Sequence, residues 1–423
     1  MEVNYMEQRE KAILVGVNLN HQPDFDYSME ELRNLTDACD IEVGGEIVQN
    51  LQRINKSHYV GTGKIDEIRA LVEMLDANVV IFNDELSPSQ IRNLEADIDC
   101  KVIDRTILIL DIFAERARTK EAQLQVEVAQ LQYMLPRLVG LRASLGRQGG
   151  GSGLKNRGAG ETKLELDRRK IEAKITALNK ELEVLVAHRK TQRKQRKKNN
   201  VPVVSLVGYT NAGKSTIMNA LVEKFNPLEN KQVFEKDMLF ATLETSVRNI
   251  SLADQKSFLL TDTVGFVSKL PHHLVKAFRS TLEEVAESDL LIHVVDYSNP
   301  NYEQLINITN ETLKDIGIEN IPTIYAYNKS DLKDMQIPTV RGEDIFLSAK
   351  QRIGMDELIG LIRKEIFTDY IKCEMLIPYD KGGIISYFNE YAHVINTSYE
   401  ETGTKLILEC KKSDYEKHQE YII

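Results

Sequence analysis

The chain has 423 residues, of which 42% are hydrophobic and 28% are charged. At about 100–200 residues per domain, this length suggests roughly two to four domains. The composition excludes wholesale disorder, a collagen-like repeat and a coiled coil throughout. No apolar run approaches the ~18–20 residues that a membrane-spanning helix needs. The acidic N-terminus lacks the apolar core of a secretory signal. We therefore expect a cytoplasmic protein, with peripheral attachment to a membrane as the alternative.

The net charge of −10 is the sum of three blocks of different sign. Residues 1–110 carry 10 basic and 21 acidic residues, residues 111–200 carry 21 and 10, and residues 201–423 carry 23 and 33. The net charges of the blocks are therefore −11, +11 and −10. A basic third in an acidic protein favours a polyanionic partner. A solvated charged helix is the alternative explanation.

The first block alternates short apolar strands with amphipathic helices. Residues 11–17, 78–83 and 101–104 have the pattern of buried strands, and residues 64–75 have that of an amphipathic helix. Ser87 and Pro88 provide an N-cap and a proline in the first turn of a further helix. This alternation predicts a small α/β domain over residues 1–110, of the nucleotide-binding type and with a mainly parallel sheet.

The basic block has helical periodicity on both sides of a glycine-rich segment. A single long helix is expected from about residue 105 to 141, with one apolar stripe formed by Leu124, Val128, Leu131 and Leu135. The glycine-rich segment spans residues 146–160, and the helical pattern then resumes from 161 to about 198. Its apolar face comprises Leu164, Ile171, Ile175, Leu178, Leu182 and Leu185. These patterns predict an antiparallel helical hairpin over residues 111–200.

The remainder is predicted to form a third and a fourth domain. Residues 201–370 contain continuous apolar runs, typical of strands that helices cover on both faces. We expect a domain with a central, mostly parallel sheet there. The last segment, residues 371–423, predicts a small α+β domain.

Residues 208–215, Gly-Tyr-Thr-Asn-Ala-Gly-Lys-Ser, match the phosphate-binding pattern G-x-x-x-x-G-K-[ST]. The motif follows a predicted strand and begins a helix, which is the context that it requires. Its glycines let several N–H groups point at one phosphate chain, and the helix N-terminus favours an anion. Lys214 would bind the β- and γ-phosphates, and the Ser215 hydroxyl would ligate Mg²⁺.

Later motifs indicate which base is bound. Asp262-Thr-Val-Gly265 follows a buried strand, where the acid can hold Mg²⁺ through water and the Gly265 N–H can reach the γ-phosphate. In residues 328–331, Asn-Lys-Ser-Asp, the Asp331 carboxylate can accept hydrogen bonds from both N1–H and the amino group of guanine. Adenine lacks that pair of donors. Residues 348–350, Ser-Ala-Lys, would close the base pocket, with the Ala349 N–H directed at guanine O6.

The sequence thus predicts a GTP- and GDP-binding site and a GTPase. Lys214, Thr242 and Gly265 are the predicted catalytic residues, and Ser215 and Thr242 the predicted Mg²⁺ ligands. The Thr242 hydroxyl would complete the Mg²⁺ shell when the γ-phosphate is present. The predicted nucleotide contacts are Gly208, Tyr209, Thr210, Asn211, Ala212, Gly213, Lys214, Ser215, Thr216, Phe240, Ala241, Thr242, Leu243, Glu244, Asp262, Thr263, Val264, Gly265, Asn328, Lys329, Ser330, Asp331, Ser348, Ala349 and Lys350.

The order of these motifs resembles the TRAFAC class of GTPases, and their surroundings resemble the HflX family. The resemblance rests on the glycine-rich segment with residues 157–169, on residues 59–64, 239–243 and 263–267, and on Leu270-Pro-His-His-Leu274. It covers roughly residues 10–370. Glu244 stands where the family more often has Asp, and residues 152–155 differ slightly from the usual loop.

The resemblance implies a GTPase that binds the large (50S) ribosomal subunit and its rRNA, and that splits or rescues stalled 70S ribosomes under stress. It also implies that ATP can be bound or hydrolysed. The basic hairpin agrees with an RNA partner, and the predicted RNA contacts are Arg142, Arg147, Lys155 and Arg157. A flexible connector is the alternative for the glycine-rich segment, and an interdomain linker for residues 189–198. We expect a monomer without stable membrane insertion.

The predicted catalytic site lacks a side chain that could orient the attacking water. Phe266 follows Gly265 at the position where Ras-like enzymes carry Gln, and a phenyl ring cannot orient the attacking water. We therefore expect slow intrinsic hydrolysis that a partner accelerates. Asn211 lies where related GTPases use Asn to help bind K⁺, so K⁺ is a second candidate cofactor beside Mg²⁺.

Two other functions remain open at this point. One is a GTPase that acts in ribosome assembly or RNA remodelling. The other is a regulatory GTPase without an RNA partner, whose basic hairpin would meet an acidic protein or a membrane surface.

Overall fold

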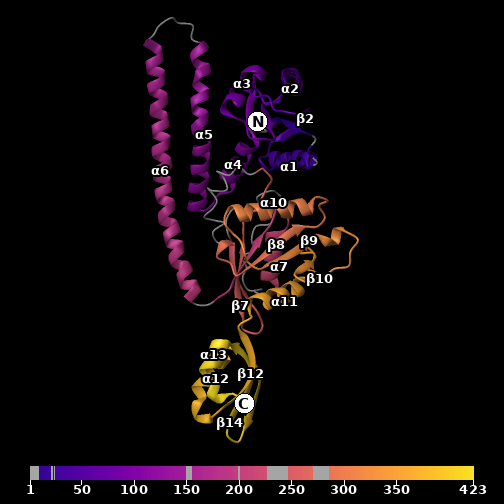
Figure 1. The fold of residues 1–423 in the computed structure, drawn as a ribbon, viewed down its shortest axis with the longest axis vertical. Helices are drawn as coiled ribbons and strands as arrows, with labels where there is room; N and C mark the ends of the chain where they lie inside the picture. The colour runs from indigo at the N-terminus through magenta and orange to yellow at the C-terminus, as the bar shows by residue number, and fades with distance from the viewer. Residues whose placement is uncertain are drawn as a thin grey trace, which may run out of the picture. The chain divides into compact units, whose positions relative to one another are not determined.

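The computed structural model describes residues 9–20, 22, 24–148, 155–198, 201–225, 246–269 and 285–423. For residues 138–148, 155–164 and 188–198 only the helical backbone is described. The chain forms two compact units. Figure 1 shows the helices and strands with their labels. The described part of the first unit comprises the residues up to Lys194 together with 264–269, and that of the second comprises the remaining residues.

The first unit begins with a four-stranded parallel sheet in the order β2-β1-β3-β4. The strands are β1 (Lys11–Leu19), β2 (Glu42–Leu51), β3 (Val79–Phe82) and β4 (Lys101–Asp104). They alternate with the helices α1 (Phe25–Ala38), α2 (Thr62–Leu75), α3 (Pro88–Ile98) and α4 (Arg105–Arg116). We call this part, residues 9–116, the N-terminal module; its fold confirms the predicted α/β sheet domain.

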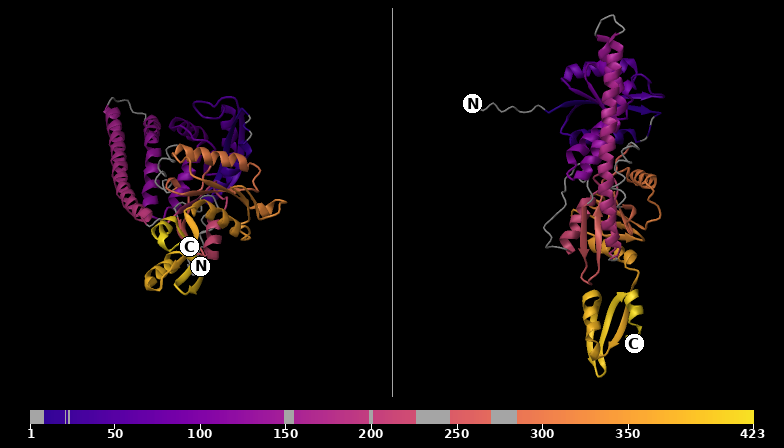
Figure 2. Two further views of the ribbon diagram at one scale, coloured as in Figure 1. Left: turned by 60° about the horizontal axis from the view of Figure 1, so that its bottom comes forward. Right: turned by 90° about the vertical axis from the view of Figure 1, so that its left-hand side faces the viewer.

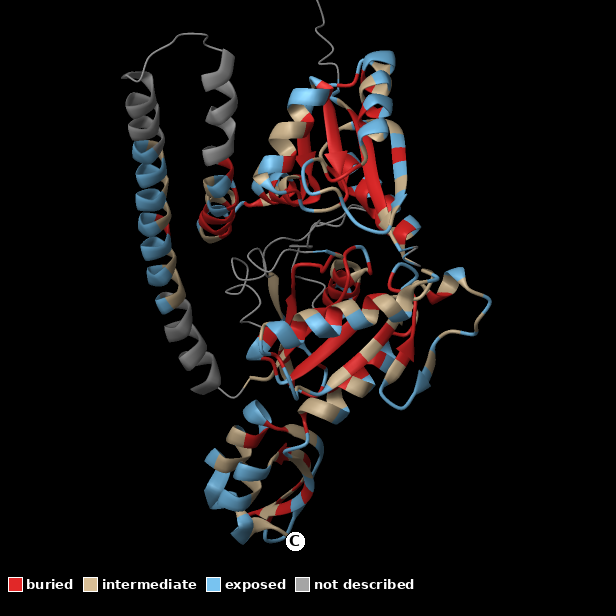
Figure 3. Ribbon diagram, turned by 45° about the horizontal axis from the view of Figure 1, so that its top comes forward, coloured by how far each residue is buried: buried red, intermediate tan, exposed pale blue. Residues whose placement is uncertain are grey.

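Both faces of this sheet are buried, which explains its continuous apolar runs. All four residues of β3 are buried. Leu14 and Ile81 face a cluster that includes Phe25 of α1 and Phe113 of α4. On the opposite face, residues of β1 and β3 pack with the apolar residues of α2 and α3. Figure 3 shows the resulting buried strands.

Side-chain caps fix where the helices of this module begin. Ser87 forms a capping box with Gln90, and Pro88 occupies the first turn, so α3 begins where the sequence predicts. The Asp104 carboxylate accepts the Ile107 N–H at 3.0 Å and caps α4.

The helical hairpin consists of α5 (Lys120–Gln148) and α6 (Lys155–Lys198). Two details of the prediction are wrong. The helix expected from residue 105 to 141 is interrupted, because Ala117 is extended and the Thr119 hydroxyl accepts the Ala122 N–H at 3.2 Å, which starts a new helix. The glycine-rich break is also shorter than 146–160: both helices continue into it, since one glycine costs a helix only about 1 kcal/mol.

The predicted apolar stripes form the seam between the two helices. Leu124, Val128 and Leu178 are buried together. Leu131, Ile175, Leu182 and Leu185 lie at their margin. The antiparallel hairpin is therefore confirmed, and the ribbons of α5 and α6 lie side by side in Figures 1 and 2. Over the part of α6 whose side chains are described, most residues are exposed or half-buried.

Helix α5 has a second apolar face that the sequence reading missed. Ala122, Val126, Ala129 and Tyr133 join the core of the N-terminal module. That core therefore continues past residue 110 into the hairpin. The same core includes Val264, the third residue of the Asp-x-x-Gly motif, and Val267, which follows the motif.

The second unit is built on a mostly parallel sheet in the order β10-β11-β9-β8-β5-β7-β6. The pairs β6–β7 and β10–β11 are antiparallel. Its strands are β5 (Val203–Val207), β6 (Ser246–Ser251), β7 (Ser257–Asp262), β8 (Leu290–Asp296), β9 (Thr323–Asn328), β10 (Thr339–Arg341) and β11 (Asp344–Phe346). Its described helices include α7 (Lys214–Phe225), α10 (Tyr302–Asp315) and α11 (Met355–Ile366).

The C-terminal part is an antiparallel three-stranded sheet in the order β12-β14-β13. It contains β12 (Tyr370–Ile377), α12 (Gly382–Tyr391), β13 (His393–Glu400), β14 (Gly403–Lys411) and α13 (Lys412–Lys417). Phe388 and the inward residues of β12 and β14 form its core. The predicted small α+β domain is confirmed. Among the described residues, no helix is both long and apolar enough to cross a membrane.

We predict that Leu178→Ala loosens the hairpin locally. Leu178 is 8% exposed in the seam, and truncating a buried leucine costs about 2–5 kcal/mol. Hydrogen exchange of the α5 and α6 amides should become faster, while the amides of β1 and β3 keep their protection. Leu166→Ala is the matched control, because Leu166 is 55% exposed on the same helix. Equal exchange in the two variants would contradict the seam.

Candidate functional site

The phosphate-loop motif joins β5 to α7, as predicted, and two of its glycines are required by the backbone. Gly208 has φ +142° and Gly213 has φ +95°. A Cβ on Gly208 would lie 2.2 Å from the Val294 carbonyl oxygen. A Cβ on Gly213 would lie 2.1 Å from Asn328 Nδ2. Only glycine therefore fits at these two positions. Its freedom of φ and lack of a side chain let the loop curl over the carboxyl ends of the strands.

Lys214 is buried at the centre of this loop. Its ammonium donates to the carbonyl oxygens of Gly208, at 3.0 Å, and Tyr209, at 2.8 Å. Burial lowers the pKa of Lys214 to about 8, and the negative charge of Asp262 acts in the opposite direction. The cation is thus held by two backbone dipoles at the place where the motif puts phosphate.

Ser215 and Asp262 form the oxygen-rich side of the site. The Ser215 hydroxyl donates to Asp262 Oδ2 at 2.6 Å. The neighbouring Thr263 hydroxyl donates to the Leu206 carbonyl at 2.7 Å, which ties the end of β7 to β5. A hydroxyl beside a carboxylate is the donor set that Mg²⁺ prefers, so these residues fit a magnesium ion.

Asn328 connects the predicted base pocket to the phosphate loop. Its Nδ2 donates to the Ala212 carbonyl at 2.9 Å, and its Oδ1 accepts the Ala349 N–H at 2.9 Å. The Ala349 N–H, expected to bind guanine O6, thus has a protein acceptor in this structure. Ser330 closes the same turn, because its N–H donates to the Leu347 carbonyl at 3.2 Å.

Asp331 and Lys329 both have side-chain partners. Asp331 Oδ2 accepts a hydrogen bond from Gln351 Nε2 at 3.1 Å. Lys329, which has φ +60°, pairs with Asp296 Oδ2 at 2.8 Å. The sequence reading did not single out Asp296 or Gln351. Asp296 ends the buried strand β8, so its position at the carboxyl edge of a parallel sheet was the available signal.

The structure thus brings together predicted residues of four motifs within the second unit: 208–216, 262–263, 328–331 and 348–350. Asn211 is exposed with φ +59°, and Lys350 is exposed. Phe240, Ala241, Thr242, Leu243 and Glu244 lie outside the described residues.

The remaining predicted residues belong to the first unit. Val264, Gly265 and the buried Phe266 are among them. Arg142 and Arg147 lie on α5, and Lys155 and Arg157 on α6, in stretches whose side chains are not described.

Three family models match successive parts of the chain. They are "GTP-binding GTPase N-terminal" at residues 26–114, "GTP-binding GTPase Middle Region" at 116–196 and "50S ribosome-binding GTPase" at 203–329. The chain is 45% identical over 415 residues to the GTPase HflX of Caldanaerobacter subterraneus subsp. tengcongensis, covering 98% of this chain and 94% of that protein. This chain belongs to the HflX family.

Other members of the family are similar over nearly their whole length. The HflX GTPase of Lacrimispora saccharolytica is 43% identical over 95% of this chain and 93% of its own. That of Escherichia coli is 39% identical over 93% of this chain and 92% of its own. The family resemblance read from the motifs is confirmed, and the protein is a GTPase of the phosphate-loop type.

We predict that nucleotide affinity falls as the pH rises through about 8. Above the lowered pKa of Lys214 the amine is neutral in the free protein, and binding of a nucleotide's phosphates must first restore its proton. Calorimetry at pH 9 in buffers of different ionisation enthalpy should therefore show proton uptake on GDP binding.

Lys214→Arg is the control for this effect. A guanidinium keeps its charge over the whole range, so the variant's affinity should change little between pH 7 and pH 9. Absence of proton uptake by the native protein at pH 9 would contradict the assignment.

Proposed function

We propose that this protein is a GTPase that binds the 50S ribosomal subunit and its rRNA, and that splits or rescues stalled 70S ribosomes under stress while hydrolysing GTP to GDP. The observation that carries this proposal is the combination, in one HflX-family chain, of a guanine-type phosphate-loop site with a basic two-helix hairpin. The block from 111 to 200 has a net charge of +11, which suits the phosphates of RNA.

In the proposed reaction the protein mainly positions and neutralises charge. Lys214 and the N–H groups of residues 208–215 bind the phosphates. Ser215 and Thr242 would ligate Mg²⁺, with Asp262 acting through water. The ion, when bound, would supply positive charge that neutralises the phosphates. The Gly265 N–H and the segment 240–244 bind the γ-phosphate end, which makes Lys214, Thr242 and Gly265 the proposed catalytic residues.

The guanine base is proposed to bind at the end of the site opposite to the phosphates. Asp331 accepts from N1–H and the amino group of guanine, exchanging its present bond to Gln351. The Ala349 N–H, which donates to Asn328 Oδ1 in this structure, is proposed to bind guanine O6. Residues 328, 329, 330, 348 and 350 complete the pocket.

We further propose four modules with the boundaries 1–110, 111–200, 201–370 and 371–423, in a monomeric, cytoplasmic protein. The hairpin residues Arg142, Arg147, Lys155 and Arg157 would contact rRNA phosphates or stack on bases. Action on assembly intermediates or other RNA, and a regulatory role without RNA, remain the alternatives that the following experiment separates.

The decisive experiment is sedimentation with ribosomes. With a non-hydrolysable GTP analogue the protein should migrate with 50S subunits and deplete 70S particles. Charge reversal at Arg147, Lys155 and Arg157 should abolish both effects without changing GDP affinity. Association only with assembly precursors would support a role in ribosome assembly or RNA remodelling. Absence of any ribosomal association would leave the regulatory role without RNA.

We predict that ribosomes accelerate hydrolysis. Phe266 has no hydrogen-bonding group for the attacking water, so the free protein lacks that contribution. Single-turnover assays should show slow hydrolysis by the free protein and at least a tenfold increase, about 1.4 kcal/mol, with 50S subunits. Fast hydrolysis by the free protein, unaffected by ribosomes, would contradict this.

We also propose that K⁺ assists the reaction through Asn211, whose side chain is exposed at the phosphate loop. Replacing K⁺ with Na⁺ at constant ionic strength should slow single-turnover hydrolysis. Asn211→Ala should remove the difference between the two salts. Equal rates of the native protein in K⁺ and Na⁺ would contradict the proposal.

A further inference from the structure

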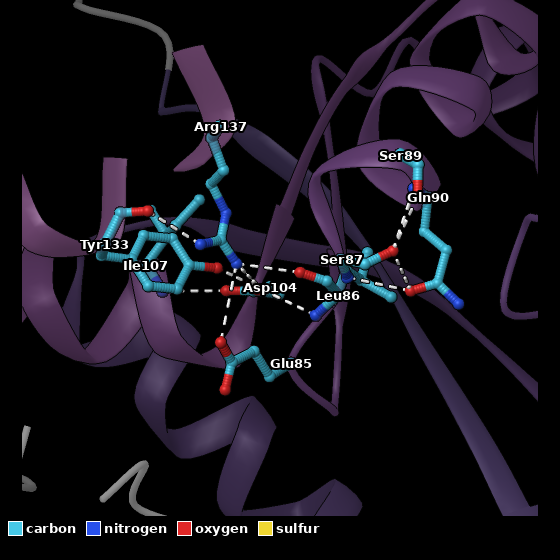
Figure 4. Close-up of polar contacts among 9 residues, drawn as sticks. All are labelled: Glu85, Leu86, Ser87, Ser89, Gln90, Asp104, Ile107, Tyr133 and Arg137. Atoms are coloured by element: carbon cyan, nitrogen blue, oxygen red, sulfur yellow. Dashed lines mark hydrogen bonds and ion pairs between the residues drawn. The ribbon is translucent and has the colours of Figure 1, made fainter. Parts of the chain in front are cut away.

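The middle of helix α5 is fastened to the N-terminal module by a buried polar network (Figure 4). Tyr133 and Arg137 of α5 reach the start of α4 and the loop between β3 and α3. None of these residues belongs to the nucleotide site, and the motifs of the sequence do not include them.

Asp104 is the centre of this network. Its side chain is fully buried. One carboxylate oxygen accepts the Ile107 N–H at 3.0 Å, and the other accepts the Leu86 N–H at 2.9 Å and the Tyr133 hydroxyl. A buried carboxylate is tolerated only when its oxygens are satisfied in this way, so the position of Tyr133 relative to the module is tightly specified.

Arg137 holds the helix and the module at once. It is 8% exposed, and its guanidinium donates to the Leu86 and Tyr133 carbonyls, each at 2.8 Å. The guanidinium also lies 3.5 Å from Asp104 and 3.7 Å from Glu85, and 3.2 Å from the centre of the Tyr133 ring. The guanidinium is planar and its N–H donors point in fixed directions, so its contacts fix the orientation of α5 as well as its distance from the module.

The network coincides with the weak point of α5. Pro136 lies inside the helix, between Tyr133 and Arg137. A proline removes one backbone N–H from the helix ladder and favours a bend. Tyr133 and Arg137 are four residues apart, on one face of the helix, so their contacts to the module bridge the proline.

Apolar packing alone does not determine the direction of the helix beyond this point. Ala122, Val126 and Ala129 already hold the first half of α5 on the module. Beyond Arg137 the helix continues to Gln148 and carries Arg142 and Arg147. Hydrophobic contact is non-directional, whereas the hydrogen bonds of Asp104 and Arg137 require particular distances and angles.

We propose that Asp104, Tyr133 and Arg137 form a joint that fixes the direction of the outer hairpin, and that they are positioning residues for ribosome binding. This rests on the proposed function, because the outer hairpin is the proposed rRNA contact. An arm that points correctly for about a tenth of the time would bind about tenfold more weakly.

The test combines a distance measurement with ribosome binding. Spin labels are placed at Glu73 in the module and Ser144 on α5, in a variant whose four cysteines are replaced by Ser. The native joint should give one narrow distance distribution by pulsed electron resonance. Arg137→Met and Tyr133→Phe should broaden it and lower 50S affinity about tenfold, with GTP affinity and ribosome-free hydrolysis unchanged.

Arg168→Met is the matched control. It removes the same charge from the hairpin, but Arg168 is an exposed residue that pairs only with Glu172 of its own helix among the described contacts, at 2.8 Å. It should leave the distance distribution narrow. Tyr133→Phe retains the ring and tests the joint independently if Arg137→Met does not fold.

The outcomes separate the joint from the proposed function. Narrow distributions in both joint variants would overturn the joint. Broad distributions with a 50S affinity equal to that of Arg168→Met would overturn its role in positioning. If the native protein itself does not bind 50S subunits, the ribosomal function fails, whereas the distance measurement still decides whether the joint directs the arm.

Discussion

The side-chain amide of Asn328 is the interaction on which the nucleotide site depends. Strands β5 and β9 are not neighbours, because β8 lies between them. The amide spans that gap by donating to Ala212 and accepting from Ala349, at 2.9 Å in each case. Only a group with both a donor and an acceptor can satisfy the two backbone partners at once. One side chain therefore joins the phosphate loop directly to the predicted base pocket.

The geometry of the phosphate loop was predictable because its physical requirements are local in sequence. The need for positive φ at Gly208 and Gly213, and for a cation at Lys214, leaves few residue choices within eight consecutive positions. The parallel strands then bring Asp262 and Asn328 to the same edge without further information. The hydrogen bond between Gln351 and Asp331 could not be predicted, because exposed polar pairs follow no periodic pattern in the sequence.

The errors concern helices whose boundaries depend on tertiary contacts. Residues 105–141 have continuous helical periodicity, and only the Thr119 cap and the extended Ala117 separate α4 from α5. The second face of α5 was missed because small residues, Ala122 and Ala129, contribute much of it. Small residues give a weak hydrophobic signal, although they allow the closest approach of a helix to its neighbour.

The segment after Asp262 is held by residues that lie far from it in the sequence. Ser268 lies six residues after that carboxylate, yet its hydroxyl donates to Glu31 and accepts from Arg105 at 3.0 Å. Glu31 and Arg105 form a buried ion pair, and Asn83 also accepts from Arg105 at 3.0 Å.

Removing two charges from water is costly unless they are paired and hydrogen-bonded, so this buried ion pair favours a polar partner such as the Ser268 hydroxyl. Lys269 adds an ion pair with Asp84 at 2.6 Å. The residues that follow the Asp-x-x-Gly motif are thus held by the polar groups of the N-terminal module, while the motif's first acid is held by Ser215.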